Sequence, residues 1–245
     1  MKFHSILSLP VAVITMKEMI DLVDESVQVN KHIWYIDINA SKAVDMQKDN
    51  DLYKCLKNCD LIGADGKSIV WASRFLRKPL PERIAGIDIM ENLVSLAHNK
   101  GYKCFFFGAT EDIVNKLVDT YSTKYSPDII AGYRNGYYTQ NDEAEIIKQI
   151  IDSKADILFV ATSSPKQEMF LYNHRSKLTN ISFMMGVGGS FDVIAGLRKR
   201  APVWMQKMGL EWVVRLIQEP RRMWKRYLIG NWQFLRLVLK EKFNK

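Results

Sequence analysis

The sequence predicts an α/β protein with a Rossmann-like, mostly parallel sheet, helices on both faces of the sheet, and a C-terminal basic helical appendage. Over residues 1–196, short apolar runs alternate with stretches of helical periodicity, a pattern typical of parallel sheets. From residue 197 onward, basic residues are interleaved with tryptophan and leucine at helical spacings. We therefore expect two units, an α/β domain at 1–196 and an amphipathic basic appendage at 197–245.

In the first half of the chain, helices are indicated by apolar residues that recur every three or four positions, as at Met19, Val23 and Val27. Strands are indicated by runs such as HIWYIDI, which combine β-branched and aromatic residues. After a short apolar run at 10–15, we expect helices and strands in alternation, at 17–29 (helix), 32–38 (strand), 41–58 (helix), 61–64 (strand) and 69–76 (helix).

The second half continues the alternation, and the run KCFFF is its clearest strand. A helix that begins near Ile87 ends at Gly101, a residue type that favours helix C-termini. Pro165 fits the first turn of a later helix. We expect strands at 103–107, 128–131, 155–161 and 181–185, helices at 111–125, at 146–151 and after 162, and a loop at 132–138.

The composition is that of a soluble globular protein, with 47% hydrophobic and 25% charged residues. The N-terminal apolar run is too short for a signal peptide and is interrupted by Pro10. No run approaches the about 18 apolar residues that a membrane-spanning helix needs. Three cysteines, with no second Cys or His pair at zinc-ligand spacing, predict free thiols in a reducing compartment.

The net charge of +8 is distributed unevenly along the chain. Residues 197–245 contain thirteen Lys or Arg against three acids, a net +10, whereas the preceding 196 residues carry a net −2. This asymmetry predicts that one end of the protein meets a polyanion or an anionic membrane.

Asp65 and Arg83 frame the segment around which the predicted site is built. Asp65 follows the apolar run at 61–64, and ligands of open α/β sheets bind outside the carboxyl ends of the strands. Arg83 follows eighteen residues later in a loop with two prolines, as a candidate anion ligand. The ordinary alternative for Asp65 is an N-cap of the next helix, and spacing alone favours that alternative. Asp37 and Asn39 stand at the end of another predicted strand.

Two glycine-containing turns follow other strands and are candidate phosphate sites. Gly108, Ala109 and Thr110 lie between a strand and a helix, where backbone N–H groups can hold a phosphate, although the turn has neither a GxGxxG pattern nor a P-loop lysine. An ordinary tight turn is the alternative. The second turn supplies Gly188, Gly189 and Asp192.

The segment SSPKQE places polar side chains in the first turn of a helix at the same edge of the sheet. Lys166 is a candidate anion ligand, and Gln167 is a candidate reader of a base or sugar. The alternative is a capping box, with Ser164 as the cap and Gln167 three residues later.

Several chemistries lack their sequence patterns. The four histidines show no metal-ligand spacing, no Gly-x-Ser-x-Gly elbow occurs, and no Asp-x-Asp pair follows a strand to hold a metal–diphosphate. We expect no metal and no cofactor, so diphosphate chemistry would depend on Arg, Lys and backbone amides.

The basic appendage contains four of the six tryptophans, beside Arg215, Arg221 and Arg222. Basic residues next to Trp, Tyr and Leu on an amphipathic helix are typical of segments at a membrane surface. We expect no nucleic acid, because no RNA-binding signature accompanies the charge. Helices that pack on the domain with solvated basic faces remain the alternative.

These stretches together resemble the WecG/TagA/CpsF bacterial glycosyltransferases (glycosyltransferase family 26). The resemblance is carried, in order, by ADGKSIVWASRFL…PERIAGID (64–88), FFFGAT (105–110), SSPKQE (163–168), GVGGSFDVIAG (186–196) and RAPVWMQKMGLEWVVRLIQEPRRMWKRYLIGN (200–231).

The resemblance implies an inverting, metal-independent transferase, peripheral on the inner face of the cell membrane. Such enzymes move N-acetylmannosamine or its uronic acid from a UDP-sugar donor to a polyprenyl-diphosphate-linked saccharide during cell-surface polysaccharide synthesis. Other family members use UDP-glucose. The resemblance also implies a catalytic role for 1–196, a membrane contact for 197–245 that closes over the site, and a possible homo-oligomer.

Carried over by position, the resemblance implies that Asp65 is the general base, Arg83 a phosphate-facing arginine, Asn39 a polar pocket residue and Gln167 an active-site glutamine. Arg215, Arg221 and Arg222 would stabilise the leaving diphosphate. One departure is Asp37, because teichoic-acid members have Thr-x-Asn where this chain has Asp-Ile-Asn. A second carboxylate near Asp65 would change acceptor contacts or raise the pKa of one of the pair, which leaves the donor sugar open. A Rossmann-type oxidoreductase and a non-catalytic membrane- or RNA-binding protein are the rival classes.

Overall fold

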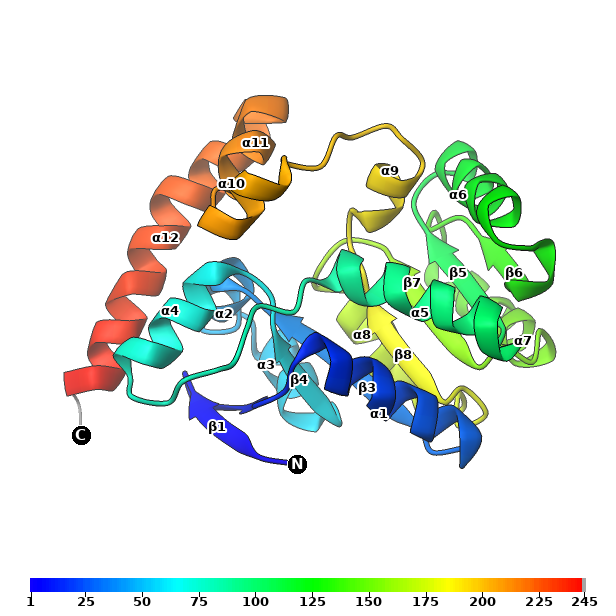
Figure 1. Cartoon of the computed structure of the whole chain (residues 1–245), viewed down its shortest axis with the longest axis horizontal. Coiled ribbons are helices and arrows are strands. Elements are labelled where there is room, and N and C mark those ends of the chain that lie inside the picture. Colours follow the sequence, from blue (N-terminus) through cyan, green and yellow to red (C-terminus); the bar gives the residue numbers. More distant parts are fainter. Residues whose placement is uncertain (244–245) are drawn as a thin grey trace.

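An eight-stranded sheet runs through the protein in the computed structural model (Figure 1). The structure describes residues 1–243, except for the side chains of Lys207, Arg222 and Arg226. The strands are β1 (Phe3–Ile6), β2 (Leu9–Ala12), β3 (Ile33–Ile38), β4 (Leu61–Ala64), β5 (Cys104–Gly108), β6 (Ile130–Arg134), β7 (Ile157–Ala161) and β8 (Phe183–Gly186). Their order in the sheet is β1-β2-β4-β3-β8-β7-β5-β6. Only the β1–β2 pair of the described strands is antiparallel, which confirms the predicted mostly parallel sheet.

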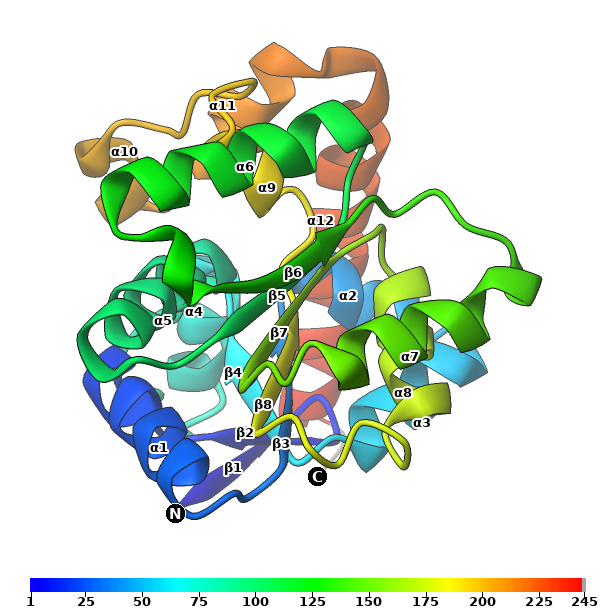
Figure 2. The ribbon, with the colours of Figure 1, turned by 90° about the vertical axis from the view of Figure 1, so that its right-hand side faces the viewer.

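Helices cover both faces of the sheet, as predicted. They are α1 (Met16–Gln28), α2 (Ala40–Asp45), α3 (Asn50–Asn58), α4 (Lys67–Phe75), α5 (Gly86–Lys100), α6 (Glu111–Lys124), α7 (Glu143–Asp152), α8 (Lys166–His174), α9 (Ser190–Ile194), α10 (Val203–Met208), α11 (Glu211–Gln218) and α12 (Pro220–Phe243), with 3₁₀ turns at Pro127–Ile129 and Gln140–Asp142. One buried apolar cluster joins the sheet to α1, α5, α6 and α9, and a second joins it to α2, α3, α4, α7, α8 and α12. Figure 2 shows α1, α5 and α6 on one side of the sheet and α3, α7 and α8 on the other.

Three expectations about individual elements are wrong. The stretch 41–58 is two helices, because Asp49 accepts hydrogen bonds from the backbone N–H groups of Asp51 and Leu52 and starts α3. The strand expected at 128–131 begins later, and β6 continues to Arg134 through part of the expected loop, paired with β5. The hairpin of β1 and β2 also has no counterpart among the predicted strands.

The basic appendage is helical, and its last helix is part of the second apolar cluster. Figure 1 shows α12 running along the molecule beside α4, with α10 and α11 at one end of it. Phe234 and Val238 of α12 are buried in the cluster with α2 and α4. Near the end of α12, Glu241 accepts a hydrogen bond from the backbone N–H of Leu7 and lies 3.0 Å from Nζ of Lys78. The second half of α12 is therefore anchored to the α/β domain. No described helix combines the length and the apolar character that crossing a membrane requires.

Candidate active site

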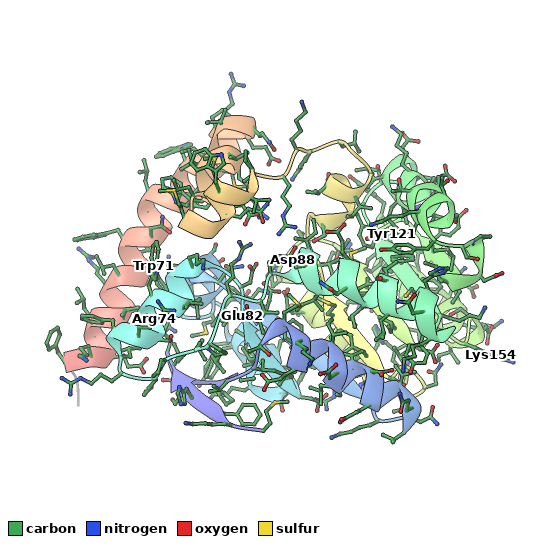
Figure 3. All side chains as sticks on the ribbon, in the orientation of Figure 1. Trp71, Arg74, Glu82, Asp88, Tyr121 and Lys154 are labelled. Carbon is green, nitrogen blue, oxygen red and sulfur yellow. The ribbon has the colours of Figure 1, made fainter. Side chains whose placement is uncertain are left out.

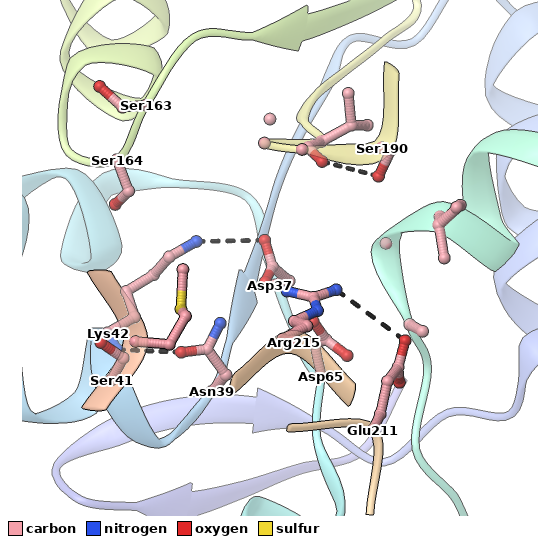
Figure 4. A pocket seen from close by; sticks show the side chains of 18 of the residues that line it. Asp37, Asn39, Ser41, Lys42, Asp65, Ser163, Ser164, Ser190, Glu211 and Arg215 are labelled. Atoms are coloured by element: carbon pink, nitrogen blue, oxygen red, sulfur yellow. Dashed lines mark hydrogen bonds and ion pairs between the residues drawn. The ribbon is translucent and has the colours of Figure 1, made fainter. Parts of the chain in front are cut away.

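A cavity of about 690 Å³ opens at the carboxyl ends of β3, β4, β7 and β8, and residues of α11 and α12 close it from the other side. This is the edge at which open α/β sheets bind ligands, and the volume is in the range of ligand sites, about 300–1,000 Å³. In Figure 4 the side chains of Asp37, Asn39, Lys42 and Asp65 come from one wall, and Glu211 comes from the appendage.

Asp65 lines this cavity. It follows β4 directly, and its backbone N–H donates to the carbonyl oxygen of Ile38 in the neighbouring strand. The N-cap of α4 is Gly66, with φ of 99° and no side-chain cap, so the interpretation of Asp65 as a helix cap is wrong. Its carboxylate instead accepts a hydrogen bond from Nε of Arg83, at 3.3 Å. Asp65 is therefore a carboxylate held at the cavity wall by a cation.

Arg83 reaches Asp65 because its loop is fixed to the end of β4, where the N–H of Ile84 donates to the carbonyl oxygen of Ala64 at 2.8 Å. The guanidinium lies between two carboxylates, since its Nη2 atom is 2.6 Å from an oxygen of Glu211 in α11. Burial lowers the pKa of Arg83, but Asp65 and Glu211 outweigh burial and raise it above its ordinary value. Arg83 is thus a permanent cation that joins the α/β domain to the appendage.

Lys42 forms a second charged cluster deeper in the cavity. Its Nζ atom is 3.1 Å from Asp37 and 2.9 Å from Glu168, and its side chain is only 6% exposed. Burial raises the pKa of Asp37, which Lys42 opposes and the nearby Asp65 reinforces. Burial also acts to raise the pKa of Glu168, but Lys42 outweighs it, so that this pKa lies below its ordinary value. The raised pKa expected for one of the two aspartates is thus found at Asp37, with burial as the larger cause.

Gln167 connects this cluster to the glycine-rich turn after β8. Its side-chain Nε2 donates to Glu168 at 2.9 Å, and its Oε1 accepts from the backbone N–H of Gly188 at 3.1 Å. A Cβ atom on Gly186 would lie 2.5 Å from Nε2 of Gln167, so glycine is required there for the amide to fit. The helix α8 has Pro165 at its N-cap and no side-chain cap, so the capping-box alternative for Gln167 is wrong.

Five other predicted site residues also line the cavity. Asn39 caps α2 by accepting from the N–H of Lys42, at 3.0 Å, and lines the cavity. The cavity is also lined by Gly188, Gly189, Asp192 and Arg215.

The residues that line this cavity do not include Gly108, Ala109, Thr110, Lys166 or Arg221. Thr110 accepts from the N–H of Ile113 and caps α6, with Gly108 and Ala109 before it at the end of β5. Nζ of Lys166 lies 3.6 Å from the ring centroid of Tyr138. Arg221 is exposed on α12, and the side chain of Arg222 lies outside the described part of the chain.

Lys42, Glu168 and Glu211 are among the charged residues of the site that sequence reasoning missed. Lys42 and Glu168 both lie in the first turn of a helix that follows a strand, and that position is a signal that could have identified them. Glu211 is one of the three acids among the basic residues of 197–245, and an isolated acid in such a segment is a weaker signal.

The fold and the cavity define an α/β protein with a polar site at the carboxyl ends of its parallel strands. This site consists of carboxylates, arginines and a glycine-rich turn. Among the described residues, no three His, Cys, Asp or Glu side chains gather as a metal would require, and metal independence stays a prediction. A family model described as "Glycosyl transferase WecG/TagA/CpsF family" matches residues 4–245. The chain therefore belongs to this family of glycosyltransferases, as its sequence motifs predict.

Three relatives carry the same name, N-acetylglucosaminyldiphosphoundecaprenol N-acetyl-beta-D-mannosaminyltransferase. The Bacillus subtilis (strain 168) protein is 38% identical over 85% of this chain and 79% of its own length. The Bacillus spizizenii protein is 33% identical over 81% of this chain and 76% of its own length. The Staphylococcus aureus (strain MW2) protein is 36% identical over 70% of this chain and 65% of its own length.

Proposed function

We propose that the protein is an inverting, metal-independent transferase that moves N-acetylmannosamine or its uronic acid from UDP to a polyprenyl-diphosphate-linked N-acetylglucosamine. The names of the relatives support the acceptor and the transferred sugar. The single observation that carries the proposal is the pairing of Asp65 with Arg83, at 3.3 Å, in the cavity at the carboxyl ends of the strands. A carboxylate and a fixed cation at one point are the two groups that this transfer needs.

In the proposed reaction, Asp65 takes the proton of the acceptor hydroxyl as its oxygen attacks the anomeric carbon. The new oxygen–carbon bond forms on the face opposite UDP, and the bond to UDP breaks with its electron pair on the leaving diphosphate. Arg83 and Arg215 stabilise the charge that builds there. Both arginines line the same cavity as Asp65, which supports this assignment.

Asp37 supports a second candidate donor within the same chemistry. It stands where teichoic-acid members have threonine, and Lys42 and burial fix its carboxylate beside Asp65. A hexose with a free 2-hydroxyl, as in UDP-glucose, offers a hydrogen-bond donor to such a carboxylate and is smaller there than an N-acetyl group, whose N–H can also donate. UDP-glucose is therefore the alternative donor to test.

The proposed site of action is the inner face of the cell membrane, where residues 197–245 would contact an anionic lipid surface. Supporting this, all four tryptophans of the appendage are solvent-exposed, from 37% for Trp212 to 59% for Trp204. Exposed tryptophan beside basic residues favours the membrane–water interface. A homo-oligomer remains a proposal that rests on the family resemblance alone.

The test is UDP release from UDP-N-acetylmannosamine, its uronic acid and UDP-glucose, with a lipid-diphosphate-N-acetylglucosamine acceptor in EDTA. Acceptor-dependent release with one donor is expected, and an α-to-β change at the anomeric carbon of the product would be seen by NMR. Release only after added divalent metal would overturn metal independence. No release with any donor, with or without metal, would favour a non-catalytic membrane-surface protein.

A further inference from the structure

A second cavity, of about 550 Å³, forms an apolar groove between α4 and the appendage. One wall is α4 and the other is α12, with Trp212 of α11 above them. Figure 3 shows Trp71 on α4, the helix that faces α12. We call this cavity the α4–α12 groove, and its walls on α4, α11 and α12 carry large apolar side chains, among them Trp71, Phe75, Trp212, Tyr227, Leu235 and Leu239.

The α4–α12 groove is continuous with the active-site cavity. The two cavities share Asn39, Ser41, Asp65, Arg83, Glu211 and Arg215 as lining residues. One end of the groove therefore contains the predicted base and two arginines. Toward the other end, Phe75, Leu235 and Leu239 are all more than one-third exposed, so that the apolar lining reaches the protein surface. The groove thus changes from polar and charged at the site to apolar at the surface.

We propose that the α4–α12 groove binds the polyprenyl segment nearest the diphosphate of the acceptor, an assignment that rests on the proposed function. An acceptor of this class has a sugar, then an anionic diphosphate, then an apolar chain. The sugar hydroxyl must reach Asp65, the diphosphate lies next along the groove beside Lys67 at the start of α4, and the chain follows the apolar walls outward. The order of chemical groups along the groove matches the order along the acceptor.

The geometry favours a lipid chain over a peptide or a second copy of the protein. The inner end of the groove opens at Asp65, so an occupant that fills it extends to the reacting centre. A peptide or a partner helix lying there would block the site, and an extended peptide would also place backbone amides against apolar walls without hydrogen-bond partners. A prenyl chain has no such groups and gains free energy from each methylene that it buries.

The test compares acceptors that differ only in prenyl length, ten against thirty carbons, at one detergent concentration. For the natural sequence we expect the KM for the longer acceptor to be at least about tenfold lower, because several methylenes are buried. Leu235→Gln combined with Leu239→Gln should reduce this ratio to below about threefold. Both side chains are partly exposed, so the substitutions leave the core intact. Leu228→Gln, on the same helix but outside the groove and 67% exposed, should keep the ratio.

The outcomes separate the groove from the transferase proposal. Transfer to every acceptor with the same KM, or an equal loss in the Leu228→Gln control, overturns the groove assignment and leaves the transferase standing. If no acceptor reacts, binding of farnesyl diphosphate decides. Trp71 and Trp212 in the groove report it by fluorescence. The groove assignment is supported if farnesyl diphosphate binds at least about tenfold more tightly than inorganic diphosphate and if the Leu235→Gln, Leu239→Gln variant loses this difference. Equal affinities for the two ligands overturn the assignment.

Discussion

Gly66, and not Asp65, occupies the N-cap of α4. The residue at the N-cap of α4 has φ of 99°, a conformation that side chains other than glycine rarely adopt. Because Gly66 occupies the cap, the carboxylate of Asp65 is free of the helix and turns to Arg83. An aspartate before a helix is ordinarily its cap, so the sequence alone favours the wrong alternative here.

Asp65→Asn tests the proposed base with little change of shape. The amide oxygen can still accept from Arg83, but it cannot take a proton from the acceptor. We expect kcat to fall about 10²- to 10⁴-fold, with the KM for the UDP-sugar within about threefold. Asp65→Ala should abolish transfer, with the thermal midpoint close to that of the natural sequence. A kcat within about threefold in the Asn variant would remove Asp65 as the base.

Glu168 and Asp37 share Lys42 but have pKa shifts of opposite sign, which gives a prediction about pH. The pKa of Glu168 lies below its ordinary 4.5, so its stabilising effect is complete above pH 4.5 and is lost as the pH falls through the folded-state pKa. The pKa of Asp37 lies above its ordinary 3.8. Its stabilising effect is therefore present below pH 3.8 and is lost as the pH rises through the folded-state pKa.

Urea unfolding at pH 7 and pH 4 of Glu168→Gln and Asp37→Asn measures this difference. Glu168→Gln should cost about 1–3 kcal/mol at pH 7, because Lys42 loses a buried charged partner, and less at pH 4. Asp37→Asn should cost under about 1 kcal/mol at pH 7, since it also removes a carboxylate that burial disfavours. Equal costs at pH 7, or a cost of Glu168→Gln that grows on acidification, would contradict the assignment.

Residues that follow a strand or open a helix could be found from the sequence, and Asp65, Asn39 and Gln167 are such residues. Their partners could not be found in this way. Glu211 reaches Arg83 across 128 positions of sequence. Such pairs depend on how the helices pack against the sheet and against one another. The local sequence pattern does not determine this packing.

At the scale of elements, the apolar runs identified six of the eight strands, because buried parallel strands read as continuous hydrophobic stretches. The two missed strands are β1 and β2. In β1, only Ile6 of the four residues is buried, so the run FHSI carries no such signal. The break between α2 and α3 was also missed, because it depends on the cap at Asp49 rather than on periodicity.

Helix α11 acts on the site through Glu211, whose carboxylate lies 2.6 Å from Arg83 and 3.9 Å from Arg215. A diphosphate that binds these arginines must compete with this carboxylate. We therefore expect Glu211→Gln to lower the Kd for UDP by about three- to tenfold, measured by calorimetry. Glu91→Gln makes the same charge change outside the cavity and should alter the Kd less than twofold. An unchanged or weaker affinity for UDP in Glu211→Gln would show that the carboxylate does not compete.

At the scale of the whole molecule, the α/β domain and the appendage were predicted as separate units, but α12 contributes to the core. Phe234 and Val238 are buried in the cluster that includes α2 and α4. Removing residues 197–245 would therefore uncover apolar surface of the α/β domain as well as remove the proposed membrane contact. A truncated chain cannot separate these two effects, and point substitutions at exposed positions of the appendage can.

Trp204→Ala combined with Trp232→Ala makes this separation, because both side chains are more than half exposed and neither belongs to a core cluster. Interfacial tryptophans bind at the headgroup level beside basic residues, so we expect the fraction that floats with phosphatidylglycerol vesicles to fall at least about threefold. The urea midpoint should stay within error of that of the natural sequence. Tyr137→Ala removes an even more exposed aromatic residue, at 75%, from the loop after β6, and this variant should float as the natural sequence does. Undiminished flotation of the double variant would contradict a role for these tryptophans and would leave the basic residues as the membrane contact. In that case, raising the salt concentration should abolish flotation.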